Sequence, residues 1–231
     1  MKHVFFVCAL FLFPLLHAGN FEKNYGIGVV HAALDQQVTL SFWENPATDK
    51  TPWFEVTFRF DSASPYSVKM ISDSPKDSIA EWLQPEYFNT SVEKARIYMN
   101  CLEKKEKFCR VIIHTQKKKT AWVSVNEKVQ MLSWLGFYQS MASIDLPRDT
   151  ENKIYEKPDT KSPFKIISGQ RGGEDHDNTD INPLQVKGRW MQVQIEDWYS
   201  EGGERKVRKV TGWILWRDAD KPLIAYNIMG C

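Results

Sequence analysis

The chain has 231 residues, of which 42% are hydrophobic and 13% aromatic, so it can bury the core of one large or two small domains. This composition excludes a disordered protein. Lysines and arginines number 30 against 29 acids, and losing Lys2 with a leader would bring the net charge to about zero. Because the basic footprint of a nucleic-acid-binding protein is missing, we predict no nucleic-acid partner.

The first eighteen residues have the pattern of an export signal. A short basic start at 1–3 precedes the apolar run 4–16, and Ala18 supplies a small residue for cleavage. We predict a signal peptide at 1–18, and hence a periplasmic or secreted protein with no stable membrane anchor after cleavage. The alternative is an uncleaved anchor, but this run would span only about 20 Å of the ~30 Å hydrocarbon core as a helix.

Branched and aromatic side chains dominate the following segments and favour β structure. Apolar runs between polar breaks predict strands at 27–33, 38–43, 53–60, 96–101, 109–115 and 120–125. One helix is predicted between them, because Ser74 can cap it, Pro75 suits its first turn and Pro85 ends it. The run 129–141 fits both a buried strand and a helix.

Two cysteines flank a charged turn between predicted strands. We predict that Cys101 and Cys109 form a disulfide in an oxidising compartment, stabilising the hairpin by roughly 2 to 3 kcal/mol. The alternative is two unpaired thiols. A zinc site is not supported, because no CxxC spacing or nearby pair of histidines is present. Cys231 can be free or link two chains, and both readings remain open.

The chain also repeats itself at matching places. Both copies show an aromatic residue, a glutamate, a proline turn, a threonine, a second proline and another aromatic residue. Two copies of one small β module explain this most economically, with 222–228 as the final strand. The interval from Pro46 to Arg96 exceeds that from Pro158 to Arg189, so the first copy carries the inserted helix. The matching pairs are 42–56 with 154–166, 94–99 with 187–192, and 120–125 with 211–216.

The second copy carries a pattern of glycines and tryptophans. After the turn at Pro158, the run 188–193 reads Gly-Arg-Trp-Met-Gln-Val, and Gly212 precedes Trp213 before a closing strand. Over 153–226 this resembles the bacterial Src homology 3 family, with its "G-x-W-x-x-V" and "G-W" segments. The resemblance implies a small β-barrel.

We therefore expect a mainly β protein with two tandem small SH3-like β-barrels, the first with an inserted helix. The expected domains are 19–142 and 143–231. The chain departs from the family in a long acidic, glycine-rich loop at 169–182 and a polar hairpin at 200–205. In the first copy, Ala95 and Ala121 stand where the second has glycine.

The second copy has more aromatic side chains than one small barrel usually buries. Those that remain exposed could stack on a sugar or hold an extended peptide. The alternative is that they form the interface between the barrels. Trp122 and Trp213, at the start of apolar strands, are expected in the cores. The ligand-binding candidates are Trp190, Trp198, Tyr199 and Trp216.

We find no catalytic constellation in the sequence. No nucleophile motif is present, and Glu44 and Glu156 occupy equivalent repeat positions rather than opposing each other. The segment 174–180 offers carboxylates and His176, but it lacks the glycine and final glutamate of a calcium loop. We predict no enzymatic activity, no cofactor and no metal.

Relatives of such modules often occur beside wall-cleaving domains and are thought to bind peptidoglycan or its peptides. The resemblance thus implies a cell-wall fragment or an envelope protein as partner. We expect an exported, non-enzymatic binding protein. The alternatives are a structural or protein-interaction scaffold and a metal-assisted hydrolase that uses His176.

Overall fold

The computed structural model describes residues 26–34, 37–61, 64–72, 82–89, 96–146, 151–167, 181–218 and 221–227. The predicted signal peptide, most of the predicted inserted helix, the loop with His176 and Cys231 lie outside these residues. Within them the protein is mainly β, as predicted.

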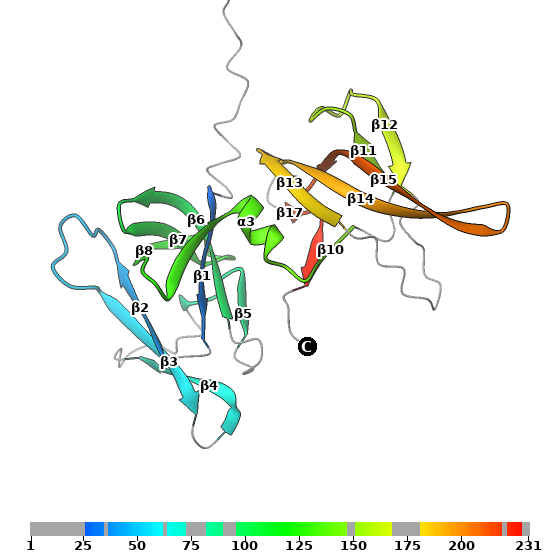
Figure 1. Ribbon diagram of the computed structural model, residues 1–231. Helices are drawn as coiled ribbons and strands as arrows, with labels where there is room; N and C mark the ends of the chain where they lie inside the picture. Colours follow the sequence, from blue (N-terminus) through cyan, green and yellow to red (C-terminus); the bar gives the residue numbers. More distant parts are fainter. Residues whose placement is uncertain are drawn as a thin grey trace, which may run out of the picture.

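The first half of the described chain forms one antiparallel sheet of nine strands, which we call the N-terminal sheet (Figure 1). Its order is β4-β3-β2-β8-β7-β6-β1-β9, and β5 pairs with β6. The strands are β1 (Gly28–Ala33), β2 (Val38–Trp43), β3 (Phe54–Asp61), β4 (Ser64–Ser72), β5 (Tyr87–Asn89), β6 (Arg96–Lys105), β7 (Phe108–His114), β8 (Lys119–Ser124) and β9 (Val129–Ser133).

The second half forms a five-stranded antiparallel sheet, the C-terminal sheet, in the order β12-β11-β15-β14-β13. Two small sheets pair β10 with β18 and β16 with β17. The strands are β10 (Ser143–Asp145), β11 (Asn152–Tyr155), β12 (Phe164–Ile167), β13 (Ile181–Lys187), β14 (Trp190–Glu201), β15 (Glu204–Leu215), β16 (Arg217–Asp218), β17 (Lys221–Pro222) and β18 (Ala225–Asn227).

A short helix, α3 (Trp134–Gln139), lies between the two larger sheets (Figure 1). It resolves the ambiguous run 129–141, which is a strand in its first part and a helix in its second. The switch occurs at Ser133, whose Oγ accepts a hydrogen bond from the Gly136 amide at 3.1 Å and caps the helix.

The two larger sheets share a strand arrangement. In each, a hairpin (β2–β3 or β11–β12) is followed by a third strand that pairs with the first strand of the hairpin. Trp43 pairs with Trp122, and Tyr155 pairs with Trp213. These positions belong to two of the three segment pairs that the sequence matches.

The third match does not follow this arrangement. The segment 96–99 lies on β6, whereas 190–192 begins β14, whose place in its sheet corresponds to β7. In both segments an arginine is followed by apolar residues, at Arg96 in the first half and at Arg189 in the second. This local similarity does not make β6 the counterpart of β14. The described strands form open sheets and no closed barrel, so SH3-like barrels remain a proposal.

The apolar side chains form two cores. The N-terminal core lies on one side of the N-terminal sheet and includes Leu40, Phe42 and Val123. The second, which we call the shared core, draws on both halves. It joins Val29, Tyr98, Trp134, Phe137, Tyr138, Met141 and Ile144 to Ile154, Ile167, Met191, Val193, Ile195, Ile214, Trp216 and Ile224. Residues on both sides of the expected boundary at 142/143 therefore pack together.

The two cysteines of the predicted disulfide lie side by side in the N-terminal core as free thiols. Cys101 pairs with Val111, and a bulge shifts the register before Cys109 pairs with Lys104. Their thiols hydrogen-bond to each other, and this contact together with burial raises the pKa of Cys101. The disulfide is not formed in this structure and stays a prediction.

We expect mild oxidation to join these two thiols. The intact mass should fall by two hydrogens, and the oxidised protein should be more stable toward urea by roughly 2–3 kcal/mol, because the unfolded chain is constrained. The double variant Cys101→Ser/Cys109→Ser should show neither change. If both thiols remain titratable after unfolding the oxidised sample, the prediction is wrong.

Candidate functional site

The four aromatic candidates do not gather in one open groove. Trp216 is fully buried in the shared core. This residue therefore follows the alternative interpretation, in which the surplus aromatic side chains pack between the two halves of the chain and do not bind a ligand. Trp190 begins β14 and is 7% exposed. Trp198 and Tyr199 pair through their backbones with Val207 and Lys206, and their side chains lie outside the described part of the structure.

A cluster of aromatic rings instead occupies the outward side of the C-terminal sheet, opposite the shared core. Tyr155 makes an edge-to-face contact with Trp190 at 5.3 Å between ring centroids, and it contacts Phe164 at 5.6 Å. Trp213 pairs with Tyr155 on the same side. Phe164 is 46% exposed. We call Tyr155, Phe164, Trp190 and Trp213 the C-terminal aromatic face.

A similar cluster lies on the outward side of the N-terminal sheet. Trp43 pairs with Trp122, and the Trp43 ring meets Phe108 edge to face at 5.1 Å. All three side chains are half-buried, while their strand neighbours Phe42 and Val123 point into the N-terminal core. We call Trp43, Phe108 and Trp122 the N-terminal aromatic face.

The two faces are equivalent by register. Phe108 lies two residues before the partner of Trp122, and Trp190 lies two residues before the partner of Trp213. The angles between the contacting ring planes also agree, at 78° for the N-terminal pair and 80° for the C-terminal pair. The same aromatic arrangement thus recurs at the same place in both sheets.

Sequence reasoning missed the N-terminal face and placed Trp122 in the core. The structure corrects this, because Ala121 and Val123 on either side of Trp122 are the buried residues of β8. Successive residues of a strand point to opposite sides, so Trp122 points outward. Trp213, in contrast, is buried as expected, at 9% exposed, although it packs on the outward side of its sheet and outside the two core clusters. The alternation in 120–125 shows that Trp122 and Val123 lie on opposite sides of the strand, but not which of them points inward.

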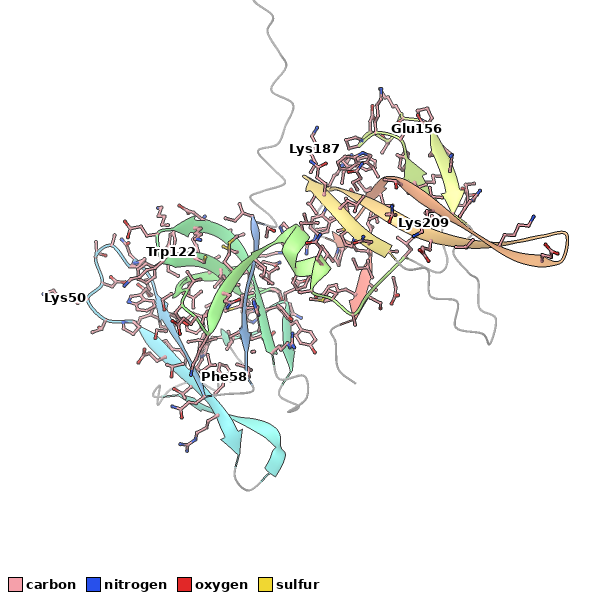
Figure 2. The ribbon with its side chains drawn as sticks, viewed as in Figure 1. Lys50, Phe58, Trp122, Glu156, Lys187 and Lys209 are labelled. Atoms are coloured by element: carbon pink, nitrogen blue, oxygen red, sulfur yellow. The ribbon has the colours of Figure 1, made fainter. Side chains whose placement is uncertain are left out.

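Lysine side chains lie over these rings. The Lys105 ammonium is 5.2 Å from the Trp122 ring centroid, and the Lys107 ammonium is 5.6 Å from that of Phe108. On the C-terminal face, Lys153 lies 4.7 Å from Phe164. Each exposed cation–π contact is worth about 0.5–1 kcal/mol. Figure 2 shows Trp122 on the N-terminal sheet, and Lys187 and Glu156 in the second half of the chain.

A pocket of about 430 Å³ lies where α3 and β10 meet β13. The Gln139 side-chain amide donates a hydrogen bond to the Pro183 carbonyl at 3.1 Å across this junction. The size suits a small molecule. The lining mixes one carboxylate, two amides, two hydroxyls and apolar groups, from Tyr138, Gln139, Met141, Ala142, Ser143, Ile144, Asp145, Ile181, Asn182 and Pro183.

A buried arginine joins the two halves beside this pocket. The Arg217 guanidinium contacts two adjoining indole rings, at 4.4 Å from the Trp134 centroid and 4.8 Å from that of Trp216. Burial lowers the pKa of Arg217 and raises the pKa values of Tyr138 and Tyr226 around it. This arrangement holds the shared core together and leaves the aromatic faces as the candidate binding surface.

Two further features bear on the chemistry available. Among the residues that the structure describes, no group of three or more His, Cys, Asp or Glu side chains is placed to hold a metal ion. In the same part of the chain, no helix has the length and apolar character needed to cross a membrane.

The fold and its surfaces define a β-sheet protein with aromatic residues on the outward side of two related sheets. Comparison of the chain with protein-family models, with curated proteins and with solved structures finds no match. The resemblance to the bacterial Src homology 3 family therefore rests on the residues quoted above.

Proposed function

We propose that this protein is an exported, non-enzymatic binding protein that recognises a cell-envelope component, peptidoglycan or a peptide, through two SH3-like halves. The observation that supports this proposal is the recurrence of one aromatic arrangement on the outward side of both sheets. The rings of the N-terminal face, and Tyr155 and Phe164 on the C-terminal face, belong to neither core cluster, because the core residues of the same strands point to the other side.

The chemistry of the faces suits an extended polar ligand. The half-buried rings of the N-terminal face, with Tyr155 and Phe164 on the C-terminal face, offer apolar area for the C–H faces of sugars or for peptide side chains, and the lysines beside them offer hydrogen-bond donors. Two equivalent faces on one chain can also engage two repeats of the same polymer. Such linked binding raises the overall affinity without new contacts, where the geometry allows both faces to bind together.

The test is co-sedimentation of the predicted mature chain, 19–231, with purified wall sacculi. We expect retention above that of a control protein of similar size and charge. Trp43→Ala/Trp122→Ala and Tyr155→Ala/Phe164→Ala should each weaken retention by about tenfold, which corresponds to ~1.4 kcal/mol.

Leu184→Ala is the control, because Leu184 is 41% exposed on β13 and lies outside both aromatic faces. It should sediment like the unaltered chain. Absence of retention above the control protein would contradict wall binding.

A second candidate is a protein-interaction scaffold in the periplasm. The observation that favours it is the shared core, which packs Trp216 between the two halves instead of presenting it to a ligand. In-cell cross-linking from the two aromatic faces to one defined envelope protein, without sacculus binding, would support this second function.

A further inference from the structure

We infer that the pocket where α3 and β10 meet β13 binds an uncharged sugar of one or two rings. This site is separate from the two aromatic faces, so the inference goes beyond the proposed function and does not depend on it. The evidence is the volume of the pocket, the division of its lining into apolar and polar parts, and the charge of that lining.

The pocket has the size of a small-molecule site and is built from packed elements. Its volume of about 430 Å³ lies within the range of ~300–1,000 Å³ for such sites. The wall on β10 is held by strand pairing, because Ile144 pairs with Tyr226 of β18. The wall on β13 is tied to α3 by the hydrogen bond from Gln139 to the Pro183 carbonyl. The walls are therefore in place before a ligand enters, and binding does not have to order them.

The buried part of the lining, which we call the floor, is apolar. Tyr138, Met141 and Ile144 are 1%, 8% and 3% exposed, and Pro183 is also buried. Met141 and Ile144 present aliphatic groups. One face of a sugar ring carries mainly C–H bonds, and packing that face on the floor would remove apolar surface from water.

The remaining lining, which we call the rim, carries polar groups on three elements. Gln139 ends α3, Asp145 ends β10 and Asn182 lies on β13. Gln139 uses one N–H for the Pro183 carbonyl, which leaves its second N–H and its carbonyl oxygen for a ligand. The exposed Asn182 amide offers the same two kinds of group. Polar groups on three sides of an apolar floor match a ring that carries hydroxyls around its perimeter.

The charge of the lining favours an uncharged ligand over an acidic one. Asp145 is the one acid of the lining, and no basic side chain belongs to it. The neighbouring Arg217 is buried against Trp134 and Trp216 and is not part of the lining. An anionic ligand would therefore meet a carboxylate without a cation to offset the repulsion. The other polar groups are amides and hydroxyls, which suit neutral hydroxyl groups.

The test is a titration of the chain 19–231 with sugars that share a ring and differ in charge, followed by NMR shifts of the backbone amides. Glucose is neutral, whereas glucosamine is cationic in mildly acidic buffer and glucuronate is anionic. We expect saturable shifts at Gln139, Ala142 and Asn182 with glucose and with its neutral two-ring counterpart cellobiose, and binding of the charged sugars that is weaker by about fivefold. Preferential binding of a charged sugar, or no saturable shift, would overturn the inference.

Two substitutions at exposed positions of the rim locate the binding. Ala142→Trp should abolish cellobiose binding, because a large side chain there fills the pocket. Asn182→Leu keeps the side-chain size but removes the amide, so it should weaken binding about fivefold. The control is Leu184→Trp, because Leu184 is 41% exposed on β13 and does not line the pocket. Equal losses in the two tryptophan variants, or full binding by Asn182→Leu, would contradict the assignment.

The sacculus assay separates this inference from the proposed function. Trp43→Ala/Trp122→Ala should still bind cellobiose, because neither residue lines the pocket. Cellobiose binding without sacculus retention would support the sugar pocket and contradict wall binding. Sacculus retention without binding of glucose or cellobiose would overturn the sugar pocket and leave the envelope-binding function standing.

Discussion

Replacing Trp216 with alanine is expected to lower the free energy of unfolding by about 3–5 kcal/mol. The side chain is fully buried, with ring centroids 5.2 Å from Trp134 and 5.3 Å from Tyr138. Its indole N–H donates to the Gly188 carbonyl at 3.0 Å. Because these contacts join the helix between the sheets to the second half, their loss should weaken the whole shared core.

Urea unfolding followed by far-ultraviolet circular dichroism measures this effect. Trp53→Ala serves as the control, since Trp53 is 46% exposed, and it should cost less than about 2 kcal/mol. We also expect the Trp216→Ala variant to lose cooperativity, with the two halves unfolding in separate transitions. Equal destabilisation by the two substitutions would contradict the internal position of Trp216.

The protein is expected to lose stability as the pH rises from about 10 to about 12. Burial, followed by the negative charge of Glu86, raises the pKa of Tyr226 to about 12. In the unfolded chain a tyrosine ionises near pH 10. Across this interval the unfolded state releases the phenolic proton while the folded state retains it, so ionisation favours unfolding.

The contribution of the protonated Tyr226 to the free energy of unfolding is fully present below pH ~10. It is lost as the pH rises through the pKa of the folded state, and the total loss is about 2–3 kcal/mol. The measurement is urea unfolding across this range, with tyrosine ionisation followed by absorbance. Tyr226→Phe should flatten the alkaline decline, and a part should remain because burial also raises the pKa of Tyr138. An unchanged decline in Tyr226→Phe would show that Tyr226 does not carry it.

Local patterns predicted the strands well. The segment 38–43 is β2 as expected, and 27–33, 53–60, 96–101, 109–115 and 120–125 each coincide with a strand to within a few residues. Alternation of apolar and polar residues acts over neighbouring positions, so it can be read without knowing the fold. The final segment, 222–228, contains β18 at Ala225–Asn227.

The candidate site was harder to predict from the same patterns. In β8 both sides carry apolar residues, so the alternation of Ala121, Trp122 and Val123 does not tell which side points inward. Trp190 was recognised through its glycine and tryptophan pattern, but its partner Tyr155 was not. The surplus of aromatic residues in the second half makes Trp216 a candidate ligand contact, whereas in the structure it packs against α3.

By itself, the amino-acid sequence determined the mainly β class, most strand positions and the matching hairpin segments, because these depend on residues close together in the chain. Only the tertiary structure decided that Trp216 is internal and that Trp43, Phe108 and Trp122 meet on one surface. Those outcomes depend on strand pairing between distant segments and on which side of each sheet is covered, and a local pattern carries neither piece of information.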